Sequence, residues 1–394
     1  MQCRGDKIIM SKVHITLVGG QTMPVYNGIQ YCKPEKVLFI YSKESEKQKQ
    51  TLKKEIIEAG LVKDSDVLSS QPLDPVDLAE IEKTALQYKE KFANDEVSIN
   101  ISSGTKAWSY YFSTIFGDSD NSQIYYIDQN NICYNLKTKQ QEKISVDVLL
   151  QFKLNKNPLL SFTNFTSYTD SDLAIIEEIE KVRKLDIGIF TNLTNLNKEN
   201  SQKLAKSREG TFFSNNYKSY IEWNKSGDCK IGIERKKDVI ETELSSPNLT
   251  KILFNAAWFE LKVANILSKW DKAKNVYMNC KFLVNKDLNQ FDQKYAELHP
   301  KNEVDIIVDV GDKALFVECK TSITNSTDID KFNTVVRNVG GSGSKAIFIC
   351  LNKIGDKEHE KINDCDMMSY SFSESQDINE LYNLLDRKII RINK

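Results

Sequence analysis

The stretch EVDIIVDVGDKALFVECK, residues 303–320, reads as two β-strands joined by a tight turn. Gly311-Asp312 suits a two-residue type II′ loop, because that turn takes Gly at its first central position. The turn fixes the register of the hairpin, and this register sets Asp305 opposite Glu318. The remaining alternate positions on the other face are apolar. The stretch therefore predicts a hairpin with one buried face and one charged face.

The charged face of this hairpin holds the candidate catalytic side chains. The same register sets Glu303 opposite Lys320, beside the pair formed by Asp305 and Glu318. Side chains directly opposite each other on neighbouring strands are about 4.5–5.5 Å apart at Cβ, and like charges placed there destabilise a sheet. The Asp–Glu pair therefore needs a cation or a proton between its members. Carboxylate oxygens suit Mg²⁺ or Mn²⁺, and the Lys320 amine could hold a water or stabilise a phosphate.

A helix is expected upstream, in SSPNLTKILFNAAWFELKVANILSKW, with Ser246 as its N-cap and Pro247 at its first helical position. Glu260 falls on the apolar face of this helix. Burying an unpaired carboxylate is costly, so Glu260 needs a partner, and the acidic hairpin face is the natural one. The alternative is that Glu260 sits at the rim of the apolar stripe and pairs with a surface lysine.

A helix and a buried strand are expected after the hairpin, so the order is helix, hairpin with D…ExK, helix, strand. From Ser246 to Leu351 this order resembles the core of PD-(D/E)xK nucleases. The resemblance implies that Asp305, Glu318 and Glu260 hold a divalent metal and that Lys320 orients or helps to deprotonate the attacking water. The alternative from the residues alone is a charged hairpin face exposed to solvent.

The first half of the chain alternates predicted strands and helices. Apolar strands are expected at 14–19, 37–42, 66–69 and 96–101, and helices at 44–60, 74–92 and 107–116. Asp74 is the expected N-cap of the second helix, with Pro75 at its first position, and GQTMPVYNG after the first strand reads as a polar turn. A strand and an edge hairpin complete the set. This alternation predicts a mostly parallel sheet with right-handed crossovers.

Two loops of this predicted sheet carry groups that can bind a ligand. In such sheets ligands bind beyond the carboxyl ends of the strands where the strand order reverses, here between the first and the fourth. The loop at 19–24 is rich in Gly, and the loop at 102–106, SSGTK, offers free N–H groups, hydroxyls and a lysine at a helix start. The alternative is that Ser103 or Thr105 only caps the helix and Gly104 permits the turn. Neither GxGxxG nor a P-loop motif is present.

The strand ending in Asn100-Ile101-Ser102, followed by Ser103-Gly104-Thr105-Lys106 and an apolar helix, resembles the CARF domain. CARF domains are Rossmann-like sensors of cyclic oligoadenylates, and their second loop usually reads closer to N-x-T-G-G-T-K, so Ser103 replaces a Gly here. The resemblance implies that the ligand is bound by residues of both loops: Gly20, Gln21, Thr22, Met23, Pro24, Ser102, Ser103, Gly104, Thr105 and Lys106.

The two resemblances together point to the CARF-plus-nuclease effectors of type III CRISPR systems, the Can/Card group. They imply an antiviral, metal-dependent endonuclease that is allosterically activated by cyclic tetra-adenylate, acts as a homodimer and cleaves DNA, RNA or both. Two rival hypotheses stay open: a constitutive restriction- or repair-type endonuclease, and a non-enzymatic sensor or transcription regulator. An RNase of the HEPN kind is not expected, because none of His14, His299 or His359 follows an Arg at the required spacing.

The expected fold class is α/β with three parts. These are a Rossmann-like CARF domain at 1–150, an α+β connector at 151–246 and a restriction-endonuclease-like domain at 247–394. The connector has a helix-like run, DSDLAIIEEIEKVRKL, capped by Asp170 or Ser171, followed by strands that alternate polar and apolar residues.

The amino-acid composition argues against several other classes of protein. The chain has 394 residues, of which 40% are hydrophobic and 28% charged, and a net charge of −1, so no bulk positive field indicates nucleic-acid binding. No apolar run approaches the roughly 20 residues of a membrane helix, and we expect a cytoplasmic protein. The 8 cysteines are scattered and only 3 histidines accompany them, so a zinc site is not expected and reduced core thiols are.

Overall fold

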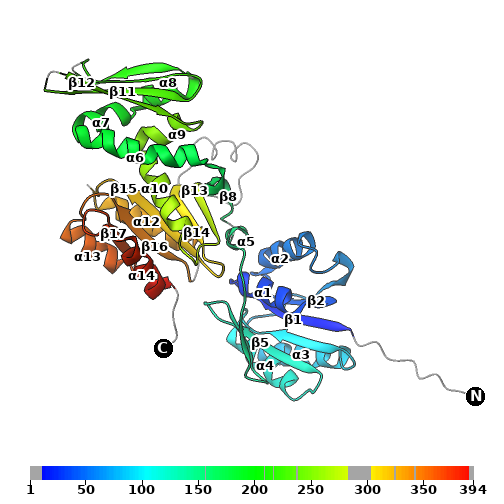
Figure 1. The fold of residues 1–394 in the computed structure, drawn as a ribbon. Coiled ribbons are helices and arrows are strands. Elements are labelled where there is room, and N and C mark those ends of the chain that lie inside the picture. Colours follow the sequence, from blue (N-terminus) through cyan, green and yellow to red (C-terminus); the bar gives the residue numbers. More distant parts are fainter. Residues whose placement is uncertain are drawn as a thin grey trace, which may run out of the picture. The chain divides into compact units, whose positions relative to one another are not determined.

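The computed structural model describes residues 11–155, 157–207, 209–215, 217–236, 238–282, 303–323, 325–340 and 343–389. The chain divides into two compact units after Pro158 (Figure 1). Unit 1 also includes two short segments from the C-terminal half, one of which is Gly311–Lys313. Unit 2 contains the remaining residues. We describe each unit by itself.

Unit 1 is built on a seven-stranded sheet with the order β3-β2-β1-β4-β5-β6-β7. The strands are β1 (Lys12–Val18), β2 (Lys36–Tyr41), β3 (Val67–Ser69), β4 (Glu96–Asn100), β5 (Ser122–Ile127), β6 (Ile132–Asn135) and β7 (Gln141–Lys143). The first five are parallel, and β6 and β7 form an antiparallel edge. The predicted sheet and its reversal of strand order between β1 and β4 are therefore confirmed.

Helices cover both faces of this sheet. They are α1 (Met23–Cys32), α2 (Glu46–Glu58), α3 (Leu78–Lys91), α4 (Lys106–Gly117) and α5 (Val148–Leu154), and η1 (Asp64–Asp66) is a short 3₁₀ turn. Ile15 of β1 lies in one core with Ile81 of α3 and Trp108 of α4. Val18 lies in the other core, with Val25 of α1. Successive side chains of β1 therefore point alternately into two hydrophobic cores, one on each face of the sheet.

Two local predictions in unit 1 are wrong. The segment predicted as a polar turn after the first strand contains the helix α1, which has Pro24 in its first turn and buries one apolar side. Proline is tolerated there because the first N–H groups of a helix have no internal partner. Helix α3 is capped by Asp77 and not by Asp74, whose carboxylate instead accepts the N–H of Val76 and of Asp77.

Unit 2 contains a six-stranded sheet with the order β17-β16-β15-β14-β13-β8. Its strands are β8 (Leu159–Asn164), β13 (Asn275–Phe282), β14 (Glu303–Asp309), β15 (Ala314–Lys320), β16 (Lys345–Cys350) and β17 (Met368–Ser371). Pairing is parallel from β15 to β17 and antiparallel elsewhere. The helices on this sheet are α10 (Ala257–Ser268), α12 (Thr327–Val339), α13 (Asp356–Asp364) and α14 (Ile378–Ile389).

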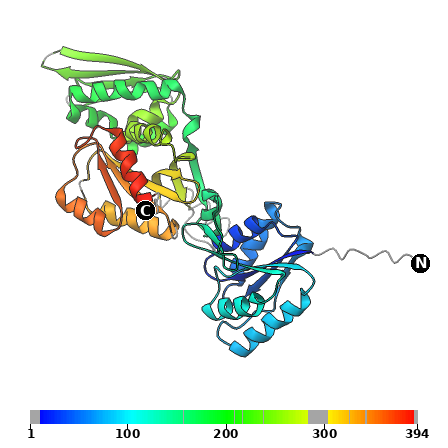
Figure 2. The same ribbon diagram turned by 60° about the horizontal axis from the view of Figure 1, so that its bottom comes forward.

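Alternating residues of β16 separate the two faces of this sheet. Ile347 and Ile349 belong to the core shared with α10 and α14, and α14 lies across the sheet as the red helix of Figure 2. Phe348 points to the opposite face, where its ring meets that of Phe332 from α12 at a centroid distance of 5.1 Å. The sheet is therefore buried on both sides, as in other α/β domains.

A four-stranded antiparallel sheet, with the order β12-β11-β10-β9, also belongs to unit 2. Its strands are β9 (Gly210–Phe213), β10 (Tyr220–Trp223), β11 (Asp228–Arg235) and β12 (Asp238–Ser245). The other helices described in unit 2 are the 16-residue α6 (Asp170–Leu185) and the shorter elements α7 (Ile187–Thr194), α8 (Lys198–Lys206), α9 (Leu249–Leu253), η2 (Phe165–Ser167) and η3 (Phe254–Ala256). One hydrophobic core joins this sheet to α6, α10 and the six-stranded sheet. The predicted division at residues 150 and 246 stays a prediction.

Two helix predictions in unit 2 need correction. The helix predicted from Ser246 is interrupted, because Asn255 and Ala256 take left-handed backbone angles, with φ of 55° and 62°, between α9 and α10. Ser246 does not cap a helix and donates its hydroxyl to the carboxylate of Asp172. Helix α6 is capped by Thr169, which forms a capping box with Asp172.

The predicted register of the 303–320 hairpin is confirmed where the ladder forms. The pairs run from Asp309 with Ala314 to Ile306 with Val317, and Gly311 in the turn has a φ of 86°. A left-handed φ of this kind costs Gly little, which is why Gly is favoured there.

Within the described residues, no helix is long and apolar enough to cross a membrane. The described cysteines are free, and five of them are buried, whereas Cys32 and Cys365 are only half-buried; Cys3 lies outside the described residues.

Candidate functional site

The acidic cluster of unit 2 forms where β14 and β15 separate. The ladder between the two strands stops at Ile306 and Val317, one position before Asp305. Asp305 Oδ2 instead accepts the backbone N–H of Cys319 at 2.7 Å. The carboxylate thus replaces a backbone carbonyl at the end of the ladder, and this contact fixes Asp305 against the strand that carries Glu318.

Lys320 is the cation of this cluster. Its Nζ lies 2.7 Å from Glu318 Oε1, and both side chains are largely buried, with exposed fractions of 32% and 14%. Burial alone would lower the pKa of Lys320, but Glu318 and Asp305 reverse this effect and raise it. The amine is therefore held in its charged form by the carboxylates around it.

The carboxylates of the cluster are held at raised pKa values. Burial raises the pKa of Glu260 to about 7, and the charges of Glu303 and Glu318 add to this rise. Burial and the charges of Glu260 and Glu318 also raise the pKa of Asp305 well above its usual value, and burial raises that of Glu318. One lysine does not compensate these acids, so the cluster favours a proton or an additional cation.

This donor set fits a hard divalent ion. Its groups are carboxylate oxygens, the ligands that Mg²⁺ and Mn²⁺ prefer, and their mutual repulsion is what a divalent ion would relieve. In the described parts of the chain, however, no group of three His, Cys, Asp or Glu side chains is arranged closely enough to hold a metal ion. A metal ion at this cluster would therefore require its carboxylates to rearrange.

A cleft of about 540 Å³ opens beside Glu260. Its wall includes Phe162 and Tyr168, the helix α9 residue Lys251, and Lys281 of β13. The Tyr168 hydroxyl bonds to Asn279, and burial together with the charges of Glu260 and Asp172 raises the pKa of Tyr168. The cleft thus presents aromatic, hydroxyl, amide and ammonium groups next to the acidic cluster.

These cleft residues were missed in the sequence analysis. Tyr168 lies in the stretch that carried no motif, and only the structure brings it to Glu260. Asn279 has a left-handed φ of 51° at an irregularity in β13, which alternation does not reveal. Nothing in the sequence distinguishes Lys251 of α9 from other lysines. Only the structure shows that Lys251 lies on the wall of the cleft, beyond the break at Asn255 and Ala256 that separates α9 from α10.

The two predicted ligand loops of unit 1 lie side by side at the carboxyl ends of β1 and β4. The backbone N–H of Gly19 donates to Ser103 Oγ at 3.0 Å. A Cβ at Gly19 would lie 2.6 Å from the backbone nitrogen of Gly104, so only Gly permits this approach. The loops therefore form one surface, as expected.

The side chain of Asn100 forms hydrogen bonds with residues on both of these segments. Its side chain is fully buried, donating to Pro24 O at 2.9 Å and accepting the N–H of Ser102 at 3.0 Å. Gly28 in α1 leaves the space through which this side chain passes, because a Cβ there would lie 2.2 Å from Asn100 Nδ2. The side chain of Asn100 thus connects α1 to the loop after β4.

The ten predicted loop residues differ in exposure. Met23 is buried, and Thr22 is buried and donates its hydroxyl to Leu154 O. Thr105 accepts the N–H of Trp108 as the N-cap of α4, which confirms its capping role. The exposed members are Gly20, Gln21, Gly104 and Lys106, while Pro24, Ser102 and Thr105 are half-buried and Ser103 is buried.

Residues 13–155 match the family model of the Card1 CARF domain. This segment coincides with the seven-stranded sheet and its helices, so unit 1 carries a CARF domain. No curated protein matches the chain.

The solved structures that share the fold include the following three. Can2 from Sulfobacillus thermosulfidooxidans, solved in complex with cyclic tetra-adenylate, is 16% identical with a TM-score of 0.65, covering 97% of this chain and 98% of that chain. Protein VC1899 from Vibrio cholerae is 12% identical with a TM-score of 0.69, covering 96% and 98%. A type III CRISPR defence DNA nuclease activated by cyclic oligoadenylate is 15% identical with a TM-score of 0.53, covering 86% of this chain and 45% of that chain.

The raised pKa of Glu260 predicts a pH-dependent stability when divalent ions are removed by a chelator. The folded state binds the Glu260 proton more tightly than the unfolded state, so this contribution to stability is lost as pH rises from about 4.5 to about 7. Glu260→Gln removes the contribution, so its unfolding midpoint should fall less than that of the wild type over this pH range. Glu243→Gln, at an exposed position of β12, serves as the control. Parallel curves for wild type and Glu260→Gln would contradict the assignment.

Proposed function

We propose that this protein is a metal-dependent endonuclease that cyclic tetra-adenylate activates during type III CRISPR antiviral defence in the cytoplasm. The observation that carries the proposal is the joint presence of a CARF domain and a buried acid–lysine cluster in the same chain. The nuclease part rests on the cluster, and the sensor part rests on the CARF match.

The acidic cluster supports phosphodiester hydrolysis. Asp305, Glu318 and Glu260 would hold Mg²⁺ or Mn²⁺, which when bound supplies Lewis-acid polarisation of the scissile phosphate. Lys320, released from Glu318, would orient the attacking water or stabilise the negative charge that develops on the phosphate. The backbone contact from Cys319 keeps Asp305 in place during this change.

The cleft beside Glu260 supports a nucleic-acid substrate, DNA or RNA. Lys251 and Lys281 lie on its wall and can contact phosphates, while Phe162 offers an aromatic face. The net charge of the chain is −1, so attraction of a nucleic acid must come from such local groups.

The paired loops of unit 1 support binding of the activator. Gly20, Gln21, Gly104 and Lys106 are exposed at the start of two helices, where backbone N–H groups and a lysine favour phosphate. Can2, which shares the fold over nearly the whole chain, was solved with cyclic tetra-adenylate. A two-fold homodimer would match the symmetry of such a ring, so we propose that two chains bind one activator.

Alanine at Glu318 should abolish strand cleavage. In an assay on labelled RNA and supercoiled plasmid with Mn²⁺ and cyclic tetra-adenylate, we expect activity to fall more than about a hundredfold, because a direct metal ligand matters more than its supporting groups. Chelator should have the same effect on the wild type. Asp330→Ala, which removes an exposed partner of Lys361, is the control and should retain activity. Full activity of Glu318→Ala would show that the acidic cluster is not the catalytic site, whereas absence of cleavage by the wild type with activator and Mn²⁺ would favour a non-enzymatic sensor.

Alanine at Lys106 should weaken activator binding. Loss of a charge-assisted hydrogen bond is typically worth about 1.5–3 kcal/mol, so the affinity measured by calorimetry should fall about tenfold or more. Lys83→Ala, an exposed lysine in α3, is the matched control. Cleavage by the wild type that ignores cyclic tetra-adenylate would instead favour a constitutive endonuclease.

A further inference from the structure

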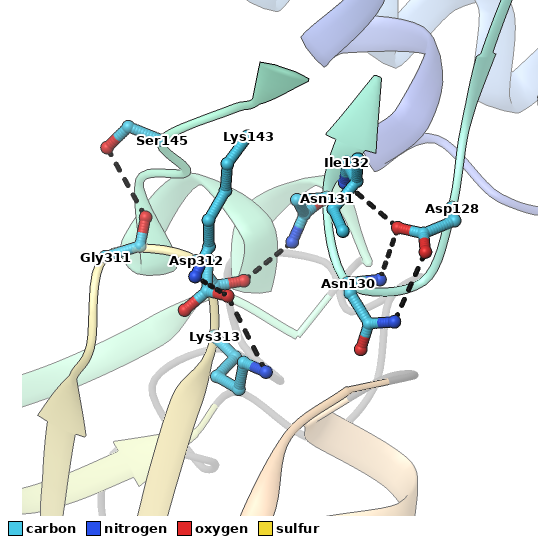
Figure 3. A network of polar contacts seen from close by, with 9 residues as sticks. All are labelled: Asp128, Asn130, Asn131, Ile132, Lys143, Ser145, Gly311, Asp312 and Lys313. Carbon is cyan, nitrogen blue, oxygen red and sulfur yellow. Dashed lines mark hydrogen bonds and ion pairs between the residues drawn. The ribbon is translucent and has the colours of Figure 1, made fainter. Parts of the chain in front are cut away.

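The turn of the catalytic hairpin belongs to unit 1, although the strands that it joins belong to unit 2. Gly311–Lys313 is part of unit 1, the unit that carries the CARF domain. The backbone N–H of Val146 donates to Gly311 O at 2.8 Å. The Ser145 hydroxyl donates to the same oxygen at 3.3 Å (Figure 3). The turn is therefore held by the segment that follows β7.

Asp312 is held through both its backbone and its side chain. Asn131 Nδ2 donates to Asp312 O at 2.6 Å, and Lys143 Nζ lies 3.0 Å from the Asp312 carboxylate (Figure 3). Asp312 is only 4% exposed, whereas the Lys143 side chain is 59% exposed. Salt screens the exposed charge of Lys143, so the contact from Asn131 to the backbone is the more specific of the two.

Asn131 is connected to the first ligand loop through α1. Asn27 is fully buried in α1, and its Nδ2 donates to Asn131 Oδ1 at 3.0 Å. Helix α1 starts directly after Thr22, at the end of the loop that carries Gly20 and Gln21. A displacement of this loop would therefore move a direct partner of Asn131.

Asn131 is also connected to the second ligand loop. The Ser102 hydroxyl accepts the N–H of Ile127 at 2.7 Å, at the end of β5. The next residue, Asp128, accepts the N–H groups of Asn130 and Ile132 and so shapes the turn in which Asn131 takes a left-handed φ of 58° (Figure 3). Two separate routes from the ligand loops therefore converge on Asn131.

We propose that Asn131 is a positioning residue that couples the activator loops to the catalytic hairpin, an inference that rests on the proposed function. Activator binding shifts α1 and the Asp128 turn, and Asn131 passes this shift to Asp312 and hence to β14 and β15. The favoured hairpin state is the one in which Glu318 leaves Lys320 and becomes available to a metal. The activator thus selects between two states of the hairpin by its differential affinity for them.

Asn131→Asp tests the coupling with little disturbance of the turn. Asp tolerates the left-handed backbone and keeps an oxygen for Asn27, but it cannot donate to Asp312 O. Asn130→Ala is the control, since Asn130 lies in the same turn but bonds to the carboxylate of Asp128. Both full-length variants are compared with the wild type by calorimetric titration of cyclic tetra-adenylate and by amide hydrogen exchange of residues 305–320.

In the wild type and Asn130→Ala, cyclic tetra-adenylate should change the exchange rates of β14 and β15 and activate cleavage. In Asn131→Asp, activator affinity should stay within about threefold of the wild type, while the ratio of activated to basal cleavage falls about tenfold, within the range of typical coupling free energies. The exchange response of β14 and β15 should also be lost.

Two other results would overturn the inference. If Asn131→Asp binds the activator and responds like the wild type, the coupling role of Asn131 is refuted while the proposed function stands. If the wild type does not bind cyclic tetra-adenylate, the proposed function itself fails and the coupling fails with it. Because the exchange measurement does not depend on cleavage, an inactive preparation still distinguishes these results.

Discussion

Mutual repulsion among buried carboxylates at the open end of one hairpin is the constraint on which the proposed chemistry depends. Asp305 and Glu318 lie where β14 and β15 separate, and Glu260 approaches them from the first turn of α10. Desolvation and like charge raise the pKa of each, and Lys320 supplies the only cation of this cluster among the described residues. Added positive charge stabilises carboxylates in such a site, and a divalent ion can supply that charge.

The fold makes this repulsion sustainable. The opposite side of the hairpin is anchored in the core of unit 2 by Ile306, Val308, Leu315 and Val317, which are fully buried. Its turn is held by main-chain and side-chain contacts in unit 1. The hairpin is thus held at its turn and along its apolar face, whereas its acidic end lies beyond the last pair of the ladder, Ile306 with Val317. The turn of the hairpin thus belongs to unit 1, and the two strands that it joins belong to unit 2.

The sequence predicted features that depend on local pattern. Gly311 indicated the turn and thereby the register from Ile306 to Asp309, and the alternating strands and helices of the first half indicated a parallel sheet with ligand loops after β1 and β4. Helix α1 was missed because Pro24 and the preceding glycines suggested a turn, although apolar burial decides the conformation of this segment.

Features that depend on distant contacts could not be predicted. The break between α9 and α10 rests on left-handed conformations at Asn255 and Ala256. Asn adopts this conformation more readily than most residues, but Ala gives no indication of it. Asp172 is fully buried because Ser246 and Asn248, far along the chain, satisfy its carboxylate. The proximity of Tyr168 to Glu260 and of Asn131 to Asp312 likewise follows from packing between segments whose spacing in the sequence indicates nothing.

Calorimetric titration of Mn²⁺ into the full-length chain, carried out in two buffers of different ionisation enthalpy, tests the central claim most directly. The account predicts that the ion binds with release of protons from the acidic cluster near pH 6, and that Glu318→Gln removes this binding. Absence of Mn²⁺ binding to the wild type, or equal binding with equal proton release in Glu318→Gln, would contradict it.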